Sequence, residues 1–449
     1  MTKPILSYKV SPARQVAFEI LRRVLVEEAF AANLLASNLT KNLSSLDRAL
    51  AQEIALGVLR HQKYIDFSLE KASNRNLAKL DLEVLIALRI GFYQIHYLTR
   101  IPTHAIVNDS VNLVKLSKKT SASGLVNAVL RKMARALEVE QIAKIDNYQQ
   151  LALIHSHPDW LVKRWVERYG ITWTTSLAEA NNRPPLVYFR VNPLKISTEA
   201  LLEKLTRVGL TITISDLIKG AFLVTSGNLE LLLNFAIEGL IYIQDAASQL
   251  VAQLVDAKAG MTVFDACAAP GGKTTAIAAQ MNNQGLIIAG DLHLARVKII
   301  KENAVKLGVK IILPICYDAK SMPFNNEQRF DRVLVDAPCT GTGTLKHNPE
   351  IKWRLSKSKI LELASLQTHI LSNCALLVGS KGRLIYSTCS LEYEENEAVV
   401  KEFLTNNQDF QIVKPDLPEF LITKEGFVRT WPHRDNMDGF FAAIMEKII

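Results

Sequence analysis

Two cysteines in the C-terminal half of the chain lie where a nucleophilic thiol can act. Cys339 belongs to the segment DAPCTGTG and Cys389 to the segment YSTCSL, and each segment follows an apolar run typical of a buried strand. A thiolate is a strong nucleophile, and covalent catalysis divides one difficult step into two easier ones. Asp336, just before Cys339, adds a carboxylate that can stabilise developing charge. The pattern predicts covalent chemistry at the ends of two neighbouring strands.

A glycine-containing segment, FDACAAPGGKT at Phe264–Thr274, is typical of a cofactor loop between a strand and a helix. Glycine lets the backbone approach a ligand closely, and the start of a helix offers free N–H groups. The residues expected to contact the cofactor here are Cys267, Ala268, Ala269, Pro270, Gly271, Gly272 and Lys273. The Gly-Lys-Thr ending also occurs in nucleoside triphosphate loops, but that motif requires a glycine where Cys267 stands.

Carboxylates end the strands that follow this loop. Asp291 is placed to accept hydrogen bonds from ribose hydroxyls, and Asp318 to accept one from an adenine amino group. Asp336 is expected at the same cofactor site. The spacing therefore predicts an adenosine-containing cofactor, and by itself it does not separate S-adenosylmethionine from NAD.

The elements that position these residues change character along the chain. Apolar periodicity and capping residues predict helices at 13–25, 46–59, 81–92, 103–116 and 124–134, which together form a helical bundle. A small α+β module should follow, with strands near 186–192, 210–214 and 222–225 around a helix at 197–208. Strands at 262–266, 286–291, 311–318, 332–337 and 383–388, with helices at 294–307 and 357–377, then predict a mostly parallel sheet. We place the domains at 1–140, 150–238 and 239–449.

The composition of the chain indicates which kinds of partner it can bind. The 449 residues carry a net charge of +9, and residues 1–150 contain 21 Lys and Arg against 13 Asp and Glu. This positive first third suits a polyanion such as RNA. The chain has no apolar run long enough for a membrane span and no signal peptide, so we expect a cytoplasmic protein without a membrane partner. Five cysteines without a C-x-x-C pair and nine histidines without ligand spacing predict reduced thiols and no metal site.

The motifs CAAPGGKT, DAPCTGTG and YSTCSL together resemble the RNA cytosine-5 methyltransferases of the NOL1/NOP2/Sun family, and Arg429–Lys447 resembles the closing segment of that family. The segments ARQVAFEILRRV and GLVNAVLRKM of the first third resemble a NusB-like RNA-binding domain. The resemblance implies an all-α NusB-like bundle, a small α+β linker module and a Rossmann-like class I methyltransferase domain. It also implies methyl transfer from S-adenosylmethionine to carbon 5 of a cytosine in 16S rRNA, by a monomer.

The resemblance also assigns roles to residues. It implies that Cys389 attacks carbon 6 of the base, that Cys339 assists product release and that Asp336 holds the base edge. Lys273 is the candidate cation for ionising Cys389. Cys316 and Cys374 are expected to be buried and inert. The candidate phosphate contacts are Arg14, Arg22, Arg23, Arg60, Arg131 and Lys132.

Three alternatives remain. An RNA-binding factor without activity would not need Cys339 and Cys389. A cysteine hydrolase would need a histidine to activate Cys389, and the nearby candidates are His369 and His433. DNA is the third alternative, as a substrate for the same covalent chemistry.

Overall fold

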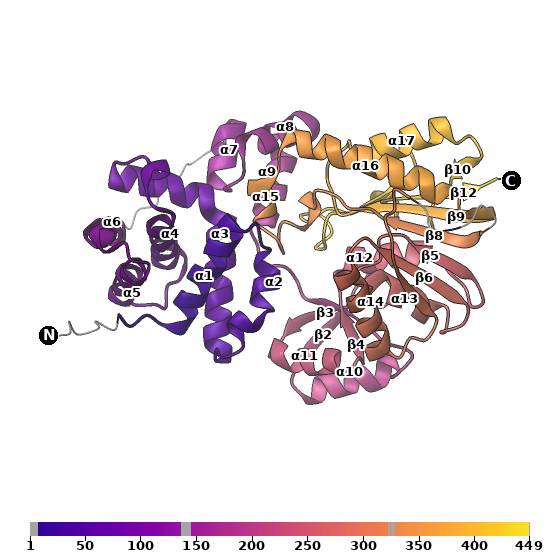
Figure 1. The fold of residues 1–449 in the computed structure, drawn as a ribbon, viewed down its shortest axis with the longest axis horizontal. Coiled ribbons are helices and arrows are strands. Elements are labelled where there is room, and N and C mark those ends of the chain that lie inside the picture. Colours follow the sequence, from indigo (N-terminus) through magenta and orange to yellow (C-terminus); the bar gives the residue numbers. More distant parts are fainter. Residues whose placement is uncertain (1–7, 136–144, 322–323, 325–327, 449) are drawn as a thin grey trace. The chain divides into compact units, whose positions relative to one another are not determined.

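The computed structural model describes residues 8–135, 145–321, 324 and 328–448 (Figure 1). The chain divides into two compact units. The first comprises the chain up to Pro184 together with Leu345–Arg354, and the second comprises Pro185–Thr344 and Leu355–Ile449. The bundle end that the sequence places at residue 140 lies outside the described residues.

The first unit is helical. Its helices are α1 (Pro12–Val26), α2 (Ala31–Leu35), α3 (Ser45–Ser73), α4 (Leu82–Tyr97), α5 (Thr103–Leu116), α6 (Ser123–Arg135), α7 (Tyr148–Ile154), α8 (Asp159–Tyr169), α9 (Ile171–Asn181) and α15 (Ile351–Arg354), with 3₁₀ turns at Asn38–Thr40, Leu77–Lys79 and Thr120–Ala122. The apolar faces of α1, α3 and α4 meet in a core that includes Ile20, Ile54 and Leu88. Helix α3 is much longer than predicted. It begins after Ser44, whose side chain accepts the Asp47 N–H, and ends at Asn74 in the left-handed conformation.

The segment Leu345–Arg354 belongs to this helical unit although it follows the Cys339 loop in sequence. The Arg354 guanidinium donates to the carbonyls of Val24, Glu28 and Ala29 at 2.7 Å, at and just beyond the end of α1. Trp353 Nε1 donates to the Leu59 carbonyl at 2.8 Å. Side chains of this segment therefore satisfy backbone groups of the bundle.

The second unit begins with a small antiparallel sheet in the order β2-β3-β1-β4. Its strands are β1 (Tyr188–Val191), β2 (Thr211–Ile214), β3 (Ala221–Ser226) and β4 (Ile241–Ile243), and its helices are α10 (Thr198–Arg207) and α11 (Leu229–Ile237). Phe189, Leu205 and Phe222 lie in the core between sheet and helices. This α+β module confirms the fold class expected for the middle of the chain.

A larger sheet in the order β10-β12-β9-β8-β5-β6-β7, with β11 paired to β12, forms the rest of this unit. Its strands are β5 (Thr262–Asp265), β6 (Leu286–Asp291), β7 (Ile312–Cys316), β8 (Phe330–Asp336), β9 (Val378–Thr388), β10 (Phe410–Ile412), β11 (Val428–Arg429) and β12 (Phe441–Lys447). Strands β5 to β9 run parallel, and β10, β11 and β12 add antiparallel pairs.

Helices cover both faces of this sheet (Figure 1). They are α12 (Ala246–Leu254), α13 (Gly272–Gln280), α14 (Leu294–Leu307), α16 (Lys357–Ala375) and α17 (Glu397–Asn406), and 3₁₀ turns lie at Thr342–Thr344 and Glu419–Leu421. Alternate strand residues face opposite layers: Val263 packs with residues of α12 to α14, whereas Phe264 packs with residues of α16 and α17. The predicted Rossmann-like class is confirmed.

The second unit also contains features that the sequence pattern did not indicate. The antiparallel strands β10 to β12 were not expected from the sequence pattern. Helix α17 begins only at Glu397, because Asn396, with φ −118° and ψ −97°, is not helical. Among the described residues, no helix has both the length and the apolar character needed to cross a membrane.

Candidate active site

The two motif cysteines face each other at one edge of the large sheet. Strands β8 and β9 are parallel neighbours in which Asp336 pairs with Ser387, so the loops after them leave from the same edge. The Sγ atoms of Cys339 and Cys389 lie 3.3 Å apart. The hydrogen bond to Cys389, together with burial, raises the pKa of the Cys339 thiol well above its usual value. Cys339 therefore keeps its proton at neutral pH. Among the described residues, neither thiol forms a hydrogen bond with a histidine.

Asp336 and Lys273 form a partly buried ion pair beside these thiols. Lys273 Nζ lies 2.6 Å from Asp336 Oδ2, and Ser387 Oγ donates to Asp336 Oδ1 at 2.8 Å. Burial alone would lower the pKa of Lys273. The Asp336 charge and hydrogen bond, followed by the attraction of Cys389, outweigh burial and leave this pKa raised. Lys273 is therefore a cation held by Asp336 within electrostatic reach of Cys389.

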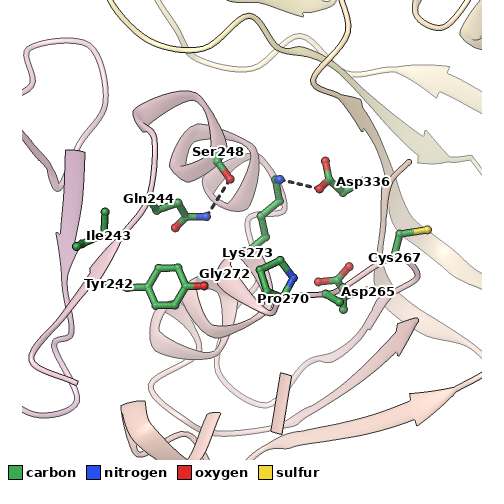
Figure 2. A pocket seen from close by; sticks show the side chains of 12 residues that line it. Tyr242, Ile243, Gln244, Ser248, Asp265, Cys267, Pro270, Gly272, Lys273 and Asp336 are labelled. Carbon is green, nitrogen blue, oxygen red and sulfur yellow. Dashed lines mark hydrogen bonds and ion pairs between the residues drawn. The ribbon is translucent and has the colours of Figure 1, made fainter. Parts of the chain in front are cut away.

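A pocket lies between the cofactor loop and the segment that runs from the end of β4 to the start of α12 (Figure 2). Its lining residues are Tyr242, Ile243, Gln244, Ser248, Asp265, Cys267, Ala268, Ala269, Pro270, Gly272, Lys273 and Asp336. Gly271 has φ +96°, a conformation that favours glycine. A Cβ at Gly272 would lie 3.0 Å from the Tyr242 ring. Glycine at these two positions therefore permits the turn into α13 and the close approach of Tyr242.

The sequence prediction missed Asp265, which ends β5 at the base of this pocket. Its Oδ2 accepts a hydrogen bond from Thr274 Oγ1 at 2.7 Å, whereas Oδ1 has no hydrogen-bond partner of good geometry among the described residues. Burial raises the pKa of Asp265 to about 7, against the hydrogen bond from Thr274. An unsatisfied buried carboxylate oxygen is suited to a cationic or hydrogen-bond-donating ligand. Tyr242, Gln244 and Ser248 were also missed. A strand-end aspartate was the signal for Asp265, and the other three lie in a single segment just ahead of the cofactor loop.

Asp291 and Asp318 occupy the ends of the next two strands. Asp291 is 5% exposed at the end of β6, and its Oδ1 accepts the backbone N–H of His293 at 3.1 Å. Asp318 lies two residues beyond β7, where it is exposed and accepts the Lys320 N–H at 2.9 Å. Neither is among the residues lining the pocket of Figure 2. Their contacts to adenosine stay predictions.

The remaining cysteines differ in exposure. Cys374 is fully buried on α16, as predicted. The prediction of a buried Cys316 is wrong, because this residue ends the edge strand β7 and is exposed. Cys267 is half-buried and packs beside the aromatic core of the sheet.

The basic residues predicted to contact phosphate differ in exposure and in partners. Arg14 and Arg60 are 6% and 4% exposed, so the prediction is wrong for both. Arg14 pairs with Asp109, and Arg60 donates to the Lys346 carbonyl. Arg22 and Arg23 pair with acidic neighbours, and Lys132 donates to the Ala72 carbonyl. Arg131 lines a groove of about 700 Å³ between α5 and α6.

Comparisons with known proteins agree with this geometry. Residues 252–446 match the family model described as 16S rRNA methyltransferase RsmB/F. The chain is 35% identical over 447 residues to the probable ribosomal RNA small subunit methyltransferase B of Bacillus subtilis (strain 168), covering 98% of this chain and 99% of that protein. It is 33% identical to ribosomal RNA small subunit methyltransferase B of Escherichia coli O17:K52:H18 (strain UMN026 / ExPEC), covering 97% and 98%.

The chain belongs to the RsmB/F family. Residues 11–135 also match the NusB family, and residues 157–228 match the ferredoxin-like domain of RsmF/B-like methyltransferases. Among solved structures, PH0851 superposes with a TM-score of 0.83 and 28% identity over 98% of this chain and 99% of that chain. A methyltransferase homologue from Pyrococcus horikoshii has a TM-score of 0.60 and 30% identity, covering 68% of this chain and all of that one. Membership in this family makes the chain a methyltransferase that acts on ribosomal RNA.

Proposed function

We propose that this RsmB/F family member transfers a methyl group from S-adenosylmethionine to carbon 5 of a cytosine in 16S rRNA, through a covalent bond between Cys389 and carbon 6. The observation that carries the proposal is the 3.3 Å separation of the Cys339 and Cys389 sulfurs beside the pocket of the cofactor loop. Two thiols at that distance can divide the work of attack and release.

The pocket suits S-adenosylmethionine as the methyl donor. This molecule carries an ammonium group and a sulfonium, and Asp265 offers a buried carboxylate oxygen that has no other partner of good geometry. Gly271 and Gly272 leave the start of α13 open to a ligand. When bound, the donor supplies an electrophilic methyl group.

Cys389 acts as the nucleophile in this proposal. Carbon 5 of cytosine reacts poorly with a methyl donor, and a thiolate that adds to carbon 6 makes carbon 5 enamine-like. Lys273 lies within electrostatic reach of Cys389, and a nearby cation favours the thiolate. Asp336, held by Lys273 and Ser387, is placed to bind the polar edge of the base.

Cys339 acts in the release step. Its raised pKa keeps the thiol protonated, so it is a poor first attacker. After methyl transfer the proton on carbon 5 must leave, and the Cys389–carbon 6 bond must break so that the thiolate is regenerated. We assign to Cys339 the assistance of this elimination. The target base must be unpaired or flipped out to expose carbon 6.

Bisulfite sequencing of 16S rRNA tests the proposal. A strain lacking this protein should lose 5-methylcytosine at one position, and the wild-type gene should restore it. Cys389→Ala should fail to restore it, whereas Cys316→Ala, which removes an exposed thiol on β7, should succeed. An unchanged 5-methylcytosine pattern in the deletion strain would refute the assignment of substrate atom.

A further inference from the structure

The turn between β9 and α17 contains a buried glutamate to which the proposed mechanism assigns no role. Glu395 has 0% exposed surface. A carboxylate removed from water needs hydrogen bonds or a cation to compensate for its lost hydration. The partners of Glu395 therefore indicate what this side chain holds in place.

Both oxygens of Glu395 accept hydrogen bonds from the two cysteine loops and from α16. Oε1 accepts the backbone N–H of Thr340 at 2.8 Å and Nε2 of Gln367 at 3.1 Å. Oε2 accepts the hydroxyls of Thr340 and Ser390. Thr340 directly follows Cys339, and Ser390 directly follows Cys389. One carboxylate thus joins the two loops immediately beside their thiols.

Gln367 extends this connection to the other side of Cys339. Its Nε2 also donates to the carbonyl of Pro338 at 2.9 Å, and Pro338 directly precedes Cys339. The residues on both sides of Cys339 are therefore fixed through Glu395 and Gln367. The Tyr386 hydroxyl, from β9, donates to the backbone carbonyl of Glu395 at 2.5 Å and so holds the turn that contains Glu395.

We propose that Glu395 is a positioning residue that keeps the thiols of Cys339 and Cys389 at working distance from each other. It does not serve as a proton acceptor in the reaction, because each oxygen already accepts two hydrogen bonds and the side chain is sealed from solvent. The catalytic meaning of this inference rests on the proposed function, whereas the geometric claim can be tested without methyl transfer.

Two substitutions test whether Glu395 acts through its hydrogen bonds or only through the volume of its side chain. Glu395→Ala removes all four acceptor contacts and leaves the Thr340 N–H unsatisfied in a buried place. In Glu395→Gln, the amide oxygen can accept from Thr340 N and Gln367, while the amide NH₂ can donate to the hydroxyls of Thr340 and Ser390. The glutamine variant should therefore preserve the bridge with the hydroxyls reversed.

Disulfide formation between the two thiols reports their positions directly. Diamide takes one hydrogen from each thiol, so its N=N bond becomes a hydrazine as the Cys339–Cys389 disulfide forms. The full-length chain is used with Cys316→Ser, which removes a competing exposed thiol, and the disulfide is followed by alkylation and peptide mass spectrometry. Glu395→Ala should form it about tenfold more slowly than the parent, equivalent to about 1.4 kcal/mol in the barrier. Glu395→Gln should stay within about threefold of the parent.

Glu397→Ala is the matched control. Glu397 lies two residues further along and is half-buried, and it pairs with Arg429 at 2.8 Å. Among the described residues, its side chain forms no hydrogen bond with either cysteine loop. This variant should lower thermal stability and leave the oxidation rate unchanged. In methyl-transfer assays, Glu395→Ala should lower kcat about tenfold with little change in KM for S-adenosylmethionine.

The inference is overturned if folded Glu395→Ala forms the disulfide at the parent rate, or if Glu395→Gln is as slow as Glu395→Ala. A parent protein that oxidises as expected but forms no 5-methylcytosine would instead contradict the proposed function and leave the positioning role supported.

Discussion

At the scale of single residues, two carboxylates line the same pocket with different partners. Asp336 has a cation, Lys273, at 2.6 Å, whereas Asp265 has one hydroxyl and burial that raises its pKa to about 7. Asp336 is therefore held by an ion pair beside the thiols, whereas about half of Asp265 is protonated at pH 7 before a ligand binds.

This difference predicts pH-dependent binding of S-adenosylmethionine. A cationic ligand needs the anionic form of Asp265, whose pKa is raised to about 7, so binding should weaken as the pH falls below 7. Between pH 7.5 and 5.5 the weakening should total about 25-fold, with a slope that approaches tenfold per pH unit at the acid end. Isothermal titration calorimetry measures it. Asp265→Asn should bind weakly at pH 7.5 and lose the slope, whereas Asp331→Asn, at the start of β8, should keep it. A slope unaffected by Asp265→Asn would contradict the role of this residue.

Sequence patterns located the residues of the site better than their contacts. Gly271, Gly272 and the two cysteines lie in short local motifs. Those motifs also made it possible to predict where the adjoining strands end. The role of Glu395 depends on Thr340, which is 55 residues away, and that of Asp265 depends on its burial and on the lack of a partner for Oδ1 among the described residues. Local periodicity carries no information on either contact. Cys316 was misplaced because the pattern did not reveal that β7 is an edge strand.

At the scale of elements, the segment Leu345–Arg354 lies in the C-terminal half of the sequence but packs as part of the helical unit. The Arg354 guanidinium donates to three carbonyls near the end of α1 and lies 5.6 Å from the Phe30 ring. Charge-assisted hydrogen bonds to backbone carbonyls at a helix end make a strong attachment. The end of α1 and the segment should therefore lose order together.

Arg354→Ala should lower the free energy of unfolding of the helical unit by about 2–3 kcal/mol, because several hydrogen bonds from a charged donor disappear. Urea denaturation followed by circular dichroism measures the loss. Arg354→Lys should recover little of it, since an ammonium cannot reproduce the planar fork. Arg207→Ala, which removes an exposed pair with Glu203, should change stability by less than about 1 kcal/mol. A loss for Arg354→Ala no larger than that of Arg207→Ala would contradict the attachment.

Sequence prediction of elements succeeded where capping and periodicity agreed. Helices α5 and α14 have the predicted bounds, whereas α3 continues well beyond the predicted end. The antiparallel strands β10 to β12 were missed because β10 and β11 are very short, and because β12 pairs with β9 and β10 across long separations in the sequence. Pairing of that kind is decided by packing and leaves little local signal.

At the scale of the whole molecule, the helical unit contributes a basic groove that is separate from the proposed active site. The helical unit has a groove between α5 and α6 whose lining includes Lys115, Arg131 and Arg135, together with the amides of Asn108 and Asn127. The residues lining this groove include no acidic side chain. A basic groove with amide donors suits an RNA backbone.

We expect Arg131→Ala to weaken binding of a 16S rRNA fragment and to reduce the slope of log K against log salt by about 1, because one phosphate contact is lost. Fluorescence anisotropy at several salt concentrations measures the slope. Lys359→Ala, an exposed lysine paired with Glu362 on α16, should leave it unchanged. Equal slopes for Arg131→Ala and the unmodified protein would show that this groove does not bind RNA.

The chemistry proposed for the molecule depends on which sulfur attacks the base, and the most direct measurement is the mass of the protein–RNA adduct after nuclease and protease digestion. With Cys339→Ala and S-adenosylmethionine, a methylated cytosine should remain attached to the peptide containing Cys389, because attack proceeds and release fails. Cys389→Ala should give no adduct. An adduct on Cys339, found in the Cys389→Ala protein, would contradict the account by reversing the roles of the two thiols.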